Sequence, residues 1–438
     1  MIDFRRLPMP LVFPTDFVWG AATSAHQVEG NNVHSDWWHF EQTGGTVLEK
    51  SGRACDHYHR FREDFDLARS FHHNAHRLSL EWSRIEPTAG SWEESALRHY
   101  EEVLTALQER GLRPFVTLHH FTLPHWLAVQ GGFSTDRAPD HFARFVEHVA
   151  KRLGPLVDTW STFNEPTVSS YSGYWFGSFA PGLTERRLGF RALRNMLVAH
   201  GTAFGILKSV DEAKPVGLVH TVDRKRPWRS WSEEDRAEAA FQDHIWNEAV
   251  FQALATGVIA LPDWPAEERP ELAGTLDYWG INFYRDSYCT AQTPSVPPAL
   301  PEEYQSHMAW GFTPEGLYDM LRRAARFGKP LYVTENGIAT ADDRERIWYL
   351  AQHLAIVHKA WRESIPIRGY FHWSLLDNYE WGSFEETFGL VHVDRDTMRR
   401  TPKPSARFYA DLIRTNTLSL DLLKGYLGNW SPIFGELK

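Results

Sequence analysis

The hydrophobic positions of this chain follow two alternating spacings. Short apolar runs, which are typical of buried strands, are followed by longer stretches in which apolar residues recur every three or four positions, which is typical of helices. In the stretch 97–107, for example, the apolar residues stand at positions 97, 100, 103, 104 and 107, and Gly111 marks the end of the predicted helix. Apolar runs at 75–82 and 114–118 stand on either side of this helix.

Runs of the first kind predict eight strands, at residues 17–23, 75–82, 114–118, 157–163, 216–222, 278–283, 332–335 and 367–373. Stretches of the second kind predict helices at residues 62–72, 97–107, 142–153, 187–210, 241–254, 317–324, 345–361 and 404–414. A strand followed by a helix, repeated eight times, predicts a single α/β domain over residues 1–438, folded as a (β/α)8 barrel. An open doubly wound sheet is the alternative, but the glycine-rich phosphate turn typical of that fold is absent.

The carboxyl ends of the predicted strands carry most of the chemistry-bearing residues. In a (β/α)8 barrel these ends form one face, and active sites lie there. Glu165 follows the strand at 157–163, and Glu335 ends the strand at 332–335. We expect residues 27–30 to form a loop after the first strand. Polar and aromatic side chains stand at or near the other strand ends: Gln27, Arg77, His119, His120, Asn164, Asn282, Tyr284, Trp373, Glu380 and Trp381.

Two carboxylates that face one site suit the hydrolysis of a glycosidic bond. One carboxylic acid protonates the leaving oxygen, and the other carboxylate attacks the sugar or activates water. Like charges in one cleft raise the pKa of one member, which supplies the acid. A solvated surface position explains any single glutamate well. A surface position does not explain well why two glutamates stand at strand ends together with amides, imidazoles and indoles.

Composition narrows the class of partner. Aromatic residues make up 14% of the chain, with 19 Trp, and aromatic faces stack well on sugar rings. The net charge of −10 disfavours a nucleic-acid partner. The only cysteines, Cys55 and Cys289, give no disulfide framework, which favours the cytoplasm. No apolar run is long enough to span a membrane, so we expect no membrane partner.

Two histidine groups resemble metal sites. His72, His73 and His76 lie across a predicted helix end and strand start, so a shared face is not expected and ordinary packing is favoured. His119, His120 and His125 invite the same comparison. We expect neither group to bind a metal.

Five motifs carry a family resemblance. They are FVWGAATSAHQVEG (17–30), LSLEWSRIEP (78–87), TFNEP (162–166), YVTENG (332–337) and WSLLDNYEWG (373–382). In order and content they resemble the motifs of glycoside hydrolase family 1, and the resemblance covers essentially the whole chain. The family consists of retaining β-glycosidases on (β/α)8 barrels, so the resemblance implies this fold, this activity and no metal or cofactor.

The resemblance also implies a role for each matching residue. It implies that Glu165 is the general acid/base and Glu335 the nucleophile. It implies a substrate-binding site of Gln27, His120, Phe121, Asn164, Tyr284, Trp310, Trp373, Glu380, Trp381 and Phe388, supported by Arg77 and Asn282. Trp373 would lie under the sugar ring, and Trp310 would be the platform for the leaving group. Arg77 would keep the nucleophile ionised.

The chain departs from the family pattern at several positions. Phe121 stands where a Trp usually touches the 3-hydroxyl, which loses an indole N–H donor and puts the preference among glucose, galactose and fucose in doubt. Thr167 follows the NEP motif where many members carry Trp, which should widen the leaving-group side. Ser383 is reminiscent of the phosphosugar-binding subgroup, but the Lys and Tyr expected downstream are missing, so unphosphorylated substrates are favoured.

The sequence therefore predicts an exo-acting, retaining β-glycosidase, closest to a β-glucosidase, that acts on small β-glycosides or short oligosaccharides. Two alternatives stay open. A transglycosylase would pass the glycosyl group to an acceptor sugar or alcohol, which the small Thr167 would favour. A catalytically inactive sugar-binding barrel is a different class, and the presence of both Glu165 and Glu335 argues against it. The oligomeric state cannot be predicted from the sequence.

Overall fold

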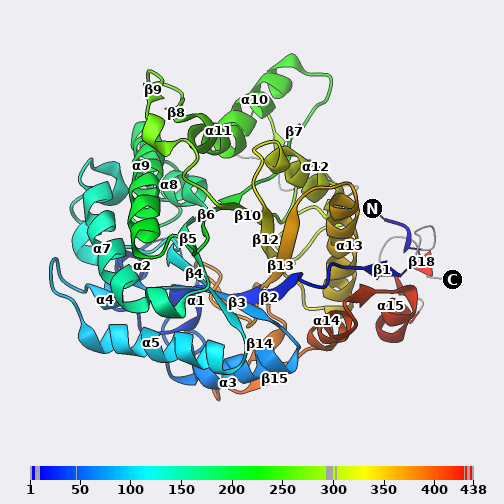
Figure 1. The fold of residues 1–438 in the computed structure, drawn as a ribbon. Helices are drawn as coiled ribbons and strands as arrows, with labels where there is room; N and C mark the ends of the chain where they lie inside the picture. Colours follow the sequence, from blue (N-terminus) through cyan, green and yellow to red (C-terminus); the bar gives the residue numbers. More distant parts are fainter. Residues whose placement is uncertain are drawn as a thin grey trace.

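The computed structural model describes residues 2–4, 10–45, 47–292, 299–300, 303–428, 430–431 and 435–436. Within these residues eight parallel strands form a closed barrel in the order β10, β12, β13, β2, β3, β4, β5, β6 (Figure 1). The strands are β2 (Val18–Ala22), β3 (Ala75–Ser79), β4 (Arg113–His119), β5 (Thr159–Asn164), β6 (Val216–Thr221), β10 (Tyr278–Asn282), β12 (Leu331–Asn336) and β13 (Ile367–Trp373). The closed ring confirms the predicted (β/α)8 barrel and excludes the open doubly wound sheet.

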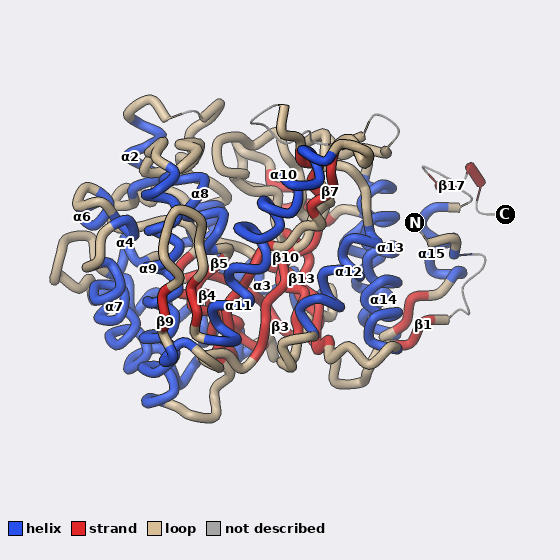
Figure 2. Tube along the Cα trace, turned by 90° about the horizontal axis from the view of Figure 1, so that it is seen from above, coloured by secondary structure: helices blue, strands red, loops and turns tan. Residues whose placement is uncertain are grey.

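Helices surround the barrel, and Figure 2 shows the strands enclosed between them (Figures 1 and 2). The outer helices are α3 (His57–Ser70), α5 (Glu94–Glu109), α7 (Ala138–Leu153), α9 (Arg186–Val210), α10 (Glu233–Asp243), α11 (Ala249–Thr256), α12 (Pro314–Ala325), α13 (Asp343–Arg362) and α14 (Pro404–Thr415). Shorter helices are α1 (Ala25–Val28), α2 (Asp36–Gln42), α4 (Trp82–Ile85), α6 (His125–Ala128), α8 (Pro166–Tyr174) and α15 (Leu420–Leu427).

In the described part of the chain, five small two-stranded sheets lie outside the barrel. They pair β1 (Leu11–Val12) with β16 (Thr417–Leu418), β7 (Lys225–Pro227) with β11 (Ser287–Cys289), β8 (Val258–Ile259) with β9 (Glu267–Glu268), β14 (Val391–Val393) with β15 (Arg400–Pro402), and β17 (Trp430–Ser431) with β18 (Gly435–Glu436). The first and last of these strands, β1 and β18, lie on the same side of the barrel (Figure 1).

The outer helices form because each presents one apolar face to the barrel. In α7 the side chains of Phe142, Phe145, Val149 and Leu153 recur at helical spacing and are all buried. Burying each such side chain contributes roughly 1.5–3 kcal/mol, so one face of α7 fixes this helix on the strands. The same pattern located the other long helices in the sequence.

Local structure differs from the sequence-based expectation at Gln27, around Glu81 and at residues 244–248. Gln27 lies in the short helix α1 and not in a loop. The strand predicted at 75–82 ends at Ser79, because the Glu81 side chain accepts a hydrogen bond from the Ser83 N–H and starts α4 at Trp82. The helix predicted at 241–254 is divided into α10, a π-helical stretch at 244–248, and α11.

The barrel strands bury side chains on both faces. In β13 Tyr370 belongs to the large core between strands and helices, whereas Phe371 and Trp373 belong to a second apolar cluster inside the barrel. Phe371 packs 4.9 Å from Phe115 between ring centroids, and Phe115 packs 5.4 Å from Tyr332. These rings fill the interior of the barrel, so it is a packed core and not a pore.

Candidate active site

Glu165 lies directly after β5 with a left-handed backbone. Asn164 is the last residue of β5, and Glu165 precedes α8 with φ 45° and ψ 64°. Phe121 (φ 71°) and Trp381 (φ 53°) share this uncommon backbone region. The left-handed region costs a non-glycine residue of order 1–2 kcal/mol. Such residues gather at functional sites, where the surrounding structure holds them.

Glu335 lies within β12, one residue before its end, and not at the strand tip as expected. Arg77 Nη1 donates to its Oε1 at 2.5 Å, and the Tyr284 hydroxyl donates to its Oε2 at 2.6 Å. Arg77 is 1% exposed and Glu335 4% exposed. A buried guanidinium and a phenol therefore both stabilise negative charge on this carboxylate.

A chain of amides connects the two carboxyl groups. Arg77 Nη2 donates to Asn164 Oδ1 at 2.7 Å, and Asn282 Nδ2 donates to the same oxygen at 3.2 Å. Asn282 Nδ2 also donates to Glu165 Oε1 at 2.7 Å. The Thr334 hydroxyl fixes the Asn282 orientation by donating to its Oδ1 at 2.7 Å. Glu165 and Glu335 are thus parts of one hydrogen-bonded network.

The environments of the two carboxyl groups differ. Burial raises the pKa of Glu165 to about 8, and the negative charge of Glu335 acts in the same direction. The hydrogen bond from Asn282 and the charge of Arg77 oppose this rise without cancelling it. At neutral pH Glu165 therefore holds a proton that it can donate, while the donors of Arg77 and Tyr284 are directed at Glu335.

His120 is neutral, and its tautomer follows from its neighbours. Asn164 Oδ1 faces Arg77, so its Nδ2 donates to His120 Nε2 at 3.2 Å. The imidazole proton then resides on Nδ1, which is buried and has no protein partner. Burial, followed by the charge of Arg77, holds the pKa of His120 well below its usual range. His120 is thus a neutral imidazole that accepts from Asn164 and carries its proton on Nδ1.

Glu380, in the segment after β13, accepts two hydrogen bonds. Trp373 Nε1 donates to its Oε1 at 3.0 Å, and Gln27 Nε2 donates to its Oε2 at 3.2 Å. Gln27 is itself held by the Ser24 hydroxyl at 2.7 Å and by the Tyr379 carbonyl oxygen at 2.8 Å. Burial raises the pKa of Glu380 to about 8. The hydrogen bond from Trp373 lowers this pKa, and the negative charge of Glu335 raises it further.

Aromatic rings form two walls of the site. On one wall Trp381 stacks nearly parallel to His120, with centroids 6.0 Å apart, and meets the edge of Phe121 at 4.9 Å. The other wall groups Tyr284 with Trp310 at 5.7 Å and with Phe388 at 6.0 Å. Flat apolar faces beside polar donors and acceptors are suited to a sugar ring and its hydroxyls.

Contacts thus link all the site residues predicted from the sequence. Hydrogen bonds join Gln27, Glu380 and Trp373, and another set joins His120 through Asn164, Arg77 and Asn282 to the two catalytic carboxyl groups. The ring contact between Trp373 and His120 connects the two sets, and further ring contacts bring in the remaining aromatic residues. Thr334, Asn378 and Thr221 were missed: Thr334 orients Asn282, Asn378 accepts from Gln27, and Thr221 hydrogen-bonds Glu165. A threonine or asparagine at a strand end is too common to identify such a role from the sequence.

Of the histidines near the start of β3, His73 and His76 are buried in the core and His72 is exposed. His76 shares a hydrogen bond with the Thr23 hydroxyl at 3.0 Å, and both ring nitrogens of His73 are buried without a partner. Among the described residues, His, Cys, Asp and Glu side chains form no group of three that could hold a metal ion. The helices in the described part of the chain also include none with the length and apolarity needed to span a membrane.

Replacing Glu380 with glutamine should stabilise the fold at neutral pH. Its folded-state pKa of about 8 lies above the unfolded value of 4.5, so the ionised carboxylate opposes folding and stability falls as the pH rises between these values. We expect Glu380→Gln to raise the free energy of unfolding at pH 8 by about 1–2 kcal/mol, discounted for partial exposure, and to change it little at pH 4. Denaturant unfolding at both pH values measures the difference. Glu385→Gln, an exposed position in the same segment, is the control, and an equal effect of both variants would contradict the assignment.

Comparisons with known proteins agree with this geometry. A family model described as glycosyl hydrolase family 1 matches residues 9–418. Beta-glucosidase A of Thermotoga maritima is 32% identical over 443 positions, covering 93% of this chain and 98% of that protein. A beta-galactosidase of Sulfolobus acidocaldarius is 32% identical over 485 positions, covering 94% and 97%. The solved structure of a beta-glycosidase from Pyrococcus horikoshii is 38% identical with a TM-score of 0.90, covering 95% and 98%. Because these matches extend over nearly its whole length, the chain belongs to glycosyl hydrolase family 1.

Proposed function

We propose that this hydrolase is a retaining exo-β-glycosidase that removes terminal β-D-glucosyl groups, and also β-galactosyl and β-fucosyl groups, from small glycosides. The observation that carries the proposal is the unequal pair of carboxyl groups. Glu165 has a pKa raised to about 8 by burial, whereas Arg77 and Tyr284 both donate to Glu335. A protonated acid beside a carboxylate is the pair that double displacement requires. The names of the beta-glucosidase and beta-galactosidase relatives support the sugar classes.

In the first step a Glu335 oxygen attacks the anomeric carbon. The bond from that carbon to the leaving oxygen breaks, and Glu165 transfers its proton to this oxygen. The product is a glycosyl ester of Glu335 and a free alcohol. Arg77 and Tyr284 hold the attacking carboxylate in place through its two oxygens.

In the second step Glu165, now ionised, takes a proton from water. The hydroxide equivalent attacks the anomeric carbon and releases the Glu335 carboxylate, so the sugar leaves with its original configuration after two inversions. Loss of negative charge on esterified Glu335 removes the repulsion that raised the pKa of Glu165. Glu165 therefore becomes a better base when a base is required.

Sugar recognition is assigned to the groups around the pair. Gln27, His120, Asn164 and Glu380 would bind the glycone hydroxyls, Trp373 would lie under the ring, and Trp310 would face the leaving group. The carboxyl group of Glu380, which accepts from Trp373 and Gln27, supplies a hydrogen-bonding group for this purpose.

Transglycosylation draws less support. It was favoured by a small Thr167 on the leaving-group side, but Thr167 is fully buried at the start of α8 and leaves no open surface there. An inactive sugar-binding barrel is disfavoured because Arg77 and Tyr284 still hold the Glu335 carboxylate. A cytoplasmic location is supported by Cys55 and Cys289, which are buried and free.

The pH profile should depend on the leaving group. With nitrophenyl β-glucoside, kcat/KM should fall as the pH rises through about 8, because Glu165 loses the proton that it must donate. With dinitrophenyl β-glucoside, whose leaving group needs no proton, this alkaline limb should weaken or vanish. Glu380 also has a pKa of about 8, so Glu380→Gln serves as the control and should keep the difference between the two substrates. The same alkaline limb with both substrates would count against Glu165 as the acid.

Removing either carboxylate should give opposite stereochemistry with azide. Glu335→Gly should abolish hydrolysis of every glycoside, and azide should then attack directly and give an α-glycosyl azide. Glu165→Gly should still release dinitrophenolate, whose departure needs no proton, in a burst and then stall, because no base remains to activate water. Azide should speed that second step and give a β-glycosyl azide. NMR of the products distinguishes the outcomes, and the reverse pattern would mean that the two roles are exchanged.

Discrimination among glycones should be weak. Phe121 packs against Trp381 and has no side-chain hydrogen-bond donor, so it cannot distinguish sugars by a hydroxyl contact. We expect nitrophenyl β-glucosides, β-galactosides and β-fucosides to differ by about 1–3 kcal/mol in transition-state energy. Comparing kcat/KM for the three measures this. A preference for one of them near 10⁵-fold, the ratio that strict hydrogen-bond recognition gives, would refute the expectation.

A further inference from the structure

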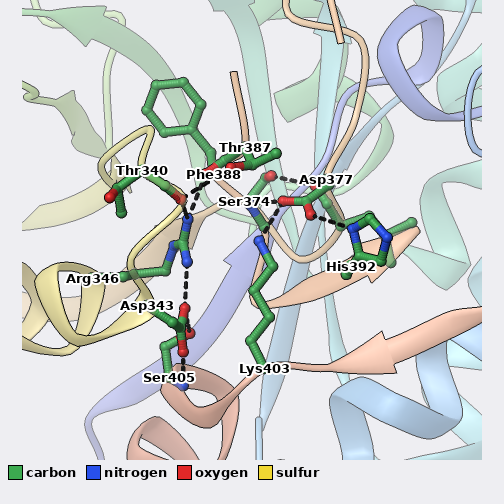
Figure 3. Close-up of polar contacts among 12 residues, drawn as sticks. Thr340, Asp343, Arg346, Ser374, Asp377, Thr387, Phe388, His392, Lys403 and Ser405 are labelled. Carbon is green, nitrogen blue, oxygen red and sulfur yellow. Dashed lines mark hydrogen bonds and ion pairs between the residues drawn. The ribbon is translucent and has the colours of Figure 1, made fainter. Parts of the chain in front are cut away.

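The segment 374–390, here called the β13 loop, leaves the end of β13 and carries Glu380, Trp381 and Phe388 into the site. A polar network surrounds the base of this loop (Figure 3). Five charged or titratable side chains contribute to this network: Asp343, Arg346, Asp377, His392 and Lys403.

Asp377 joins the start of the β13 loop to its end. Its Oδ1 accepts from the Gly389 backbone N–H at 2.9 Å and from Lys403 Nζ at 2.7 Å, and its Oδ2 lies 3.2 Å from His392 Nδ1. Its own backbone N–H donates to the Val391 carbonyl oxygen at 2.8 Å. The pair of Asp377 and Lys403 is called the clasp below.

The two ends of the β13 loop are in close backbone contact at Gly389. A Cβ atom on Gly389 would lie 2.1 Å from the Asp377 backbone nitrogen and 2.3 Å from the Leu376 carbonyl carbon. Only glycine fits at this position. The hydrogen bond from Gly389 to the Asp377 carboxylate therefore forms at a fixed backbone crossing.

Arg346 holds the C-terminal part of the β13 loop. This α13 residue is 1% exposed, and its Nη2 donates to the carbonyl oxygens of Thr340 at 2.9 Å and Thr387 at 2.5 Å, while Nη1 pairs with Asp343. Thr387 directly precedes Phe388 of the aromatic wall. The first and last parts of the β13 loop are thus both anchored by charged side chains.

Stability alone explains the clasp poorly. Asp377 is 8% exposed, and burial lowers the pKa of Lys403 to about 8, which reflects the cost of keeping an ammonium away from water. Buried ion pairs are often no more stabilising than apolar side chains of similar volume, and their best-attested role is to specify one geometry. The geometry at stake is that of Glu380, whose contacts to Trp373 and Gln27 are already 3.0 and 3.2 Å long. Displacement of such groups by about 1 Å is costly in an active site.

We propose that Asp377 and Lys403 are positioning residues for glycone recognition: through the β13 loop, the clasp fixes where Glu380 and Trp381 meet the sugar, without touching it. The inference rests on the proposed function. It differs from a stability role in one respect, because it links residues outside the site to the recognition of particular hydroxyl groups.

The test measures how much each hydroxyl contributes, with and without the clasp. Nitrophenyl β-glucoside and its 4-deoxy and 6-deoxy analogues are compared by kcat/KM in wild type, and Glu380→Gln identifies the hydroxyl that Glu380 binds. In wild type, removing that hydroxyl lowers kcat/KM by a certain factor. In Lys403→Met and Asp377→Asn we expect this factor to be about tenfold smaller, because the loop no longer presents Glu380 correctly. Asp377→Asn keeps the size of the side chain and an acceptor for Gly389, so it decides the matter if Lys403→Met does not fold.

Two controls separate positioning from stability. Lys403→Arg keeps a cation near Asp377 and should restore most of the hydroxyl dependence. Arg323→Met breaks an ion pair on α12 whose cation is as exposed as that of the clasp, because the Arg323 and Lys403 side chains are both 15% exposed. The Arg323 guanidinium donates to Asp243 at 2.6 Å. This variant should lower the unfolding midpoint but leave the hydroxyl dependence as in wild type.

The outcomes are distinct. If the clasp variants lower kcat/KM by the same factor for all three glucosides, the clasp is structural only and the inference is overturned, while the proposed function stands. If wild type hydrolyses none of the nitrophenyl β-glycosides, the proposed function fails and the inference falls with it. A reduced dependence on the hydroxyl that Glu380 binds, restored by Lys403→Arg, supports positioning.

Discussion

The buried guanidinium of Arg77 is the constraint on which the site depends. One of its nitrogens donates to Glu335 and another to Asn164, so a single cation inside the barrel sets both a carboxylate and an amide. The orientation of Asn164 in turn fixes the tautomer of His120. Because a buried cation needs an anion nearby, Glu335 and Arg77 stabilise each other, and neither can be removed without leaving an uncompensated charge.

Two residues of the same type acquire different chemistry from their neighbours. Glu335 lies within a strand between a guanidinium and a phenol, whereas Glu165 lies on a left-handed turn where burial outweighs its amide donor. The difference does not reside in the glutamates. It resides in Arg77 on β3, Asn282 at the end of β10 and Tyr284 just after it, which meet the carboxylates only in the folded barrel.

The sequence predicted what depends on local pattern. Strand and helix periodicity located the barrel, strand ends located both glutamates, and the motif resemblance identified the family, which the comparisons confirm. The individual roles of the site residues stay predictions. What could not be predicted depends on contacts distant in sequence: the helix that contains Gln27, the threonine that orients Asn282, and the pairing of Asp377 with Lys403. Hydrophobic spacing carries no information on which amide oxygen faces which donor.

The closure of the barrel has a consequence for synthesis on the ribosome. The first barrel strand pairs with the last, Val18 with Gly369 and Ala22 with Trp373, so β2 has no neighbour on that edge until nearly the whole chain has been made. A nascent chain that stops before residue 367 would expose the hydrogen-bonding edges of both β2 and β12, and unpaired edges are templates for aggregation. The barrel therefore cannot close before β13 has been made, and products that stop earlier are natural targets for chaperones and proteases.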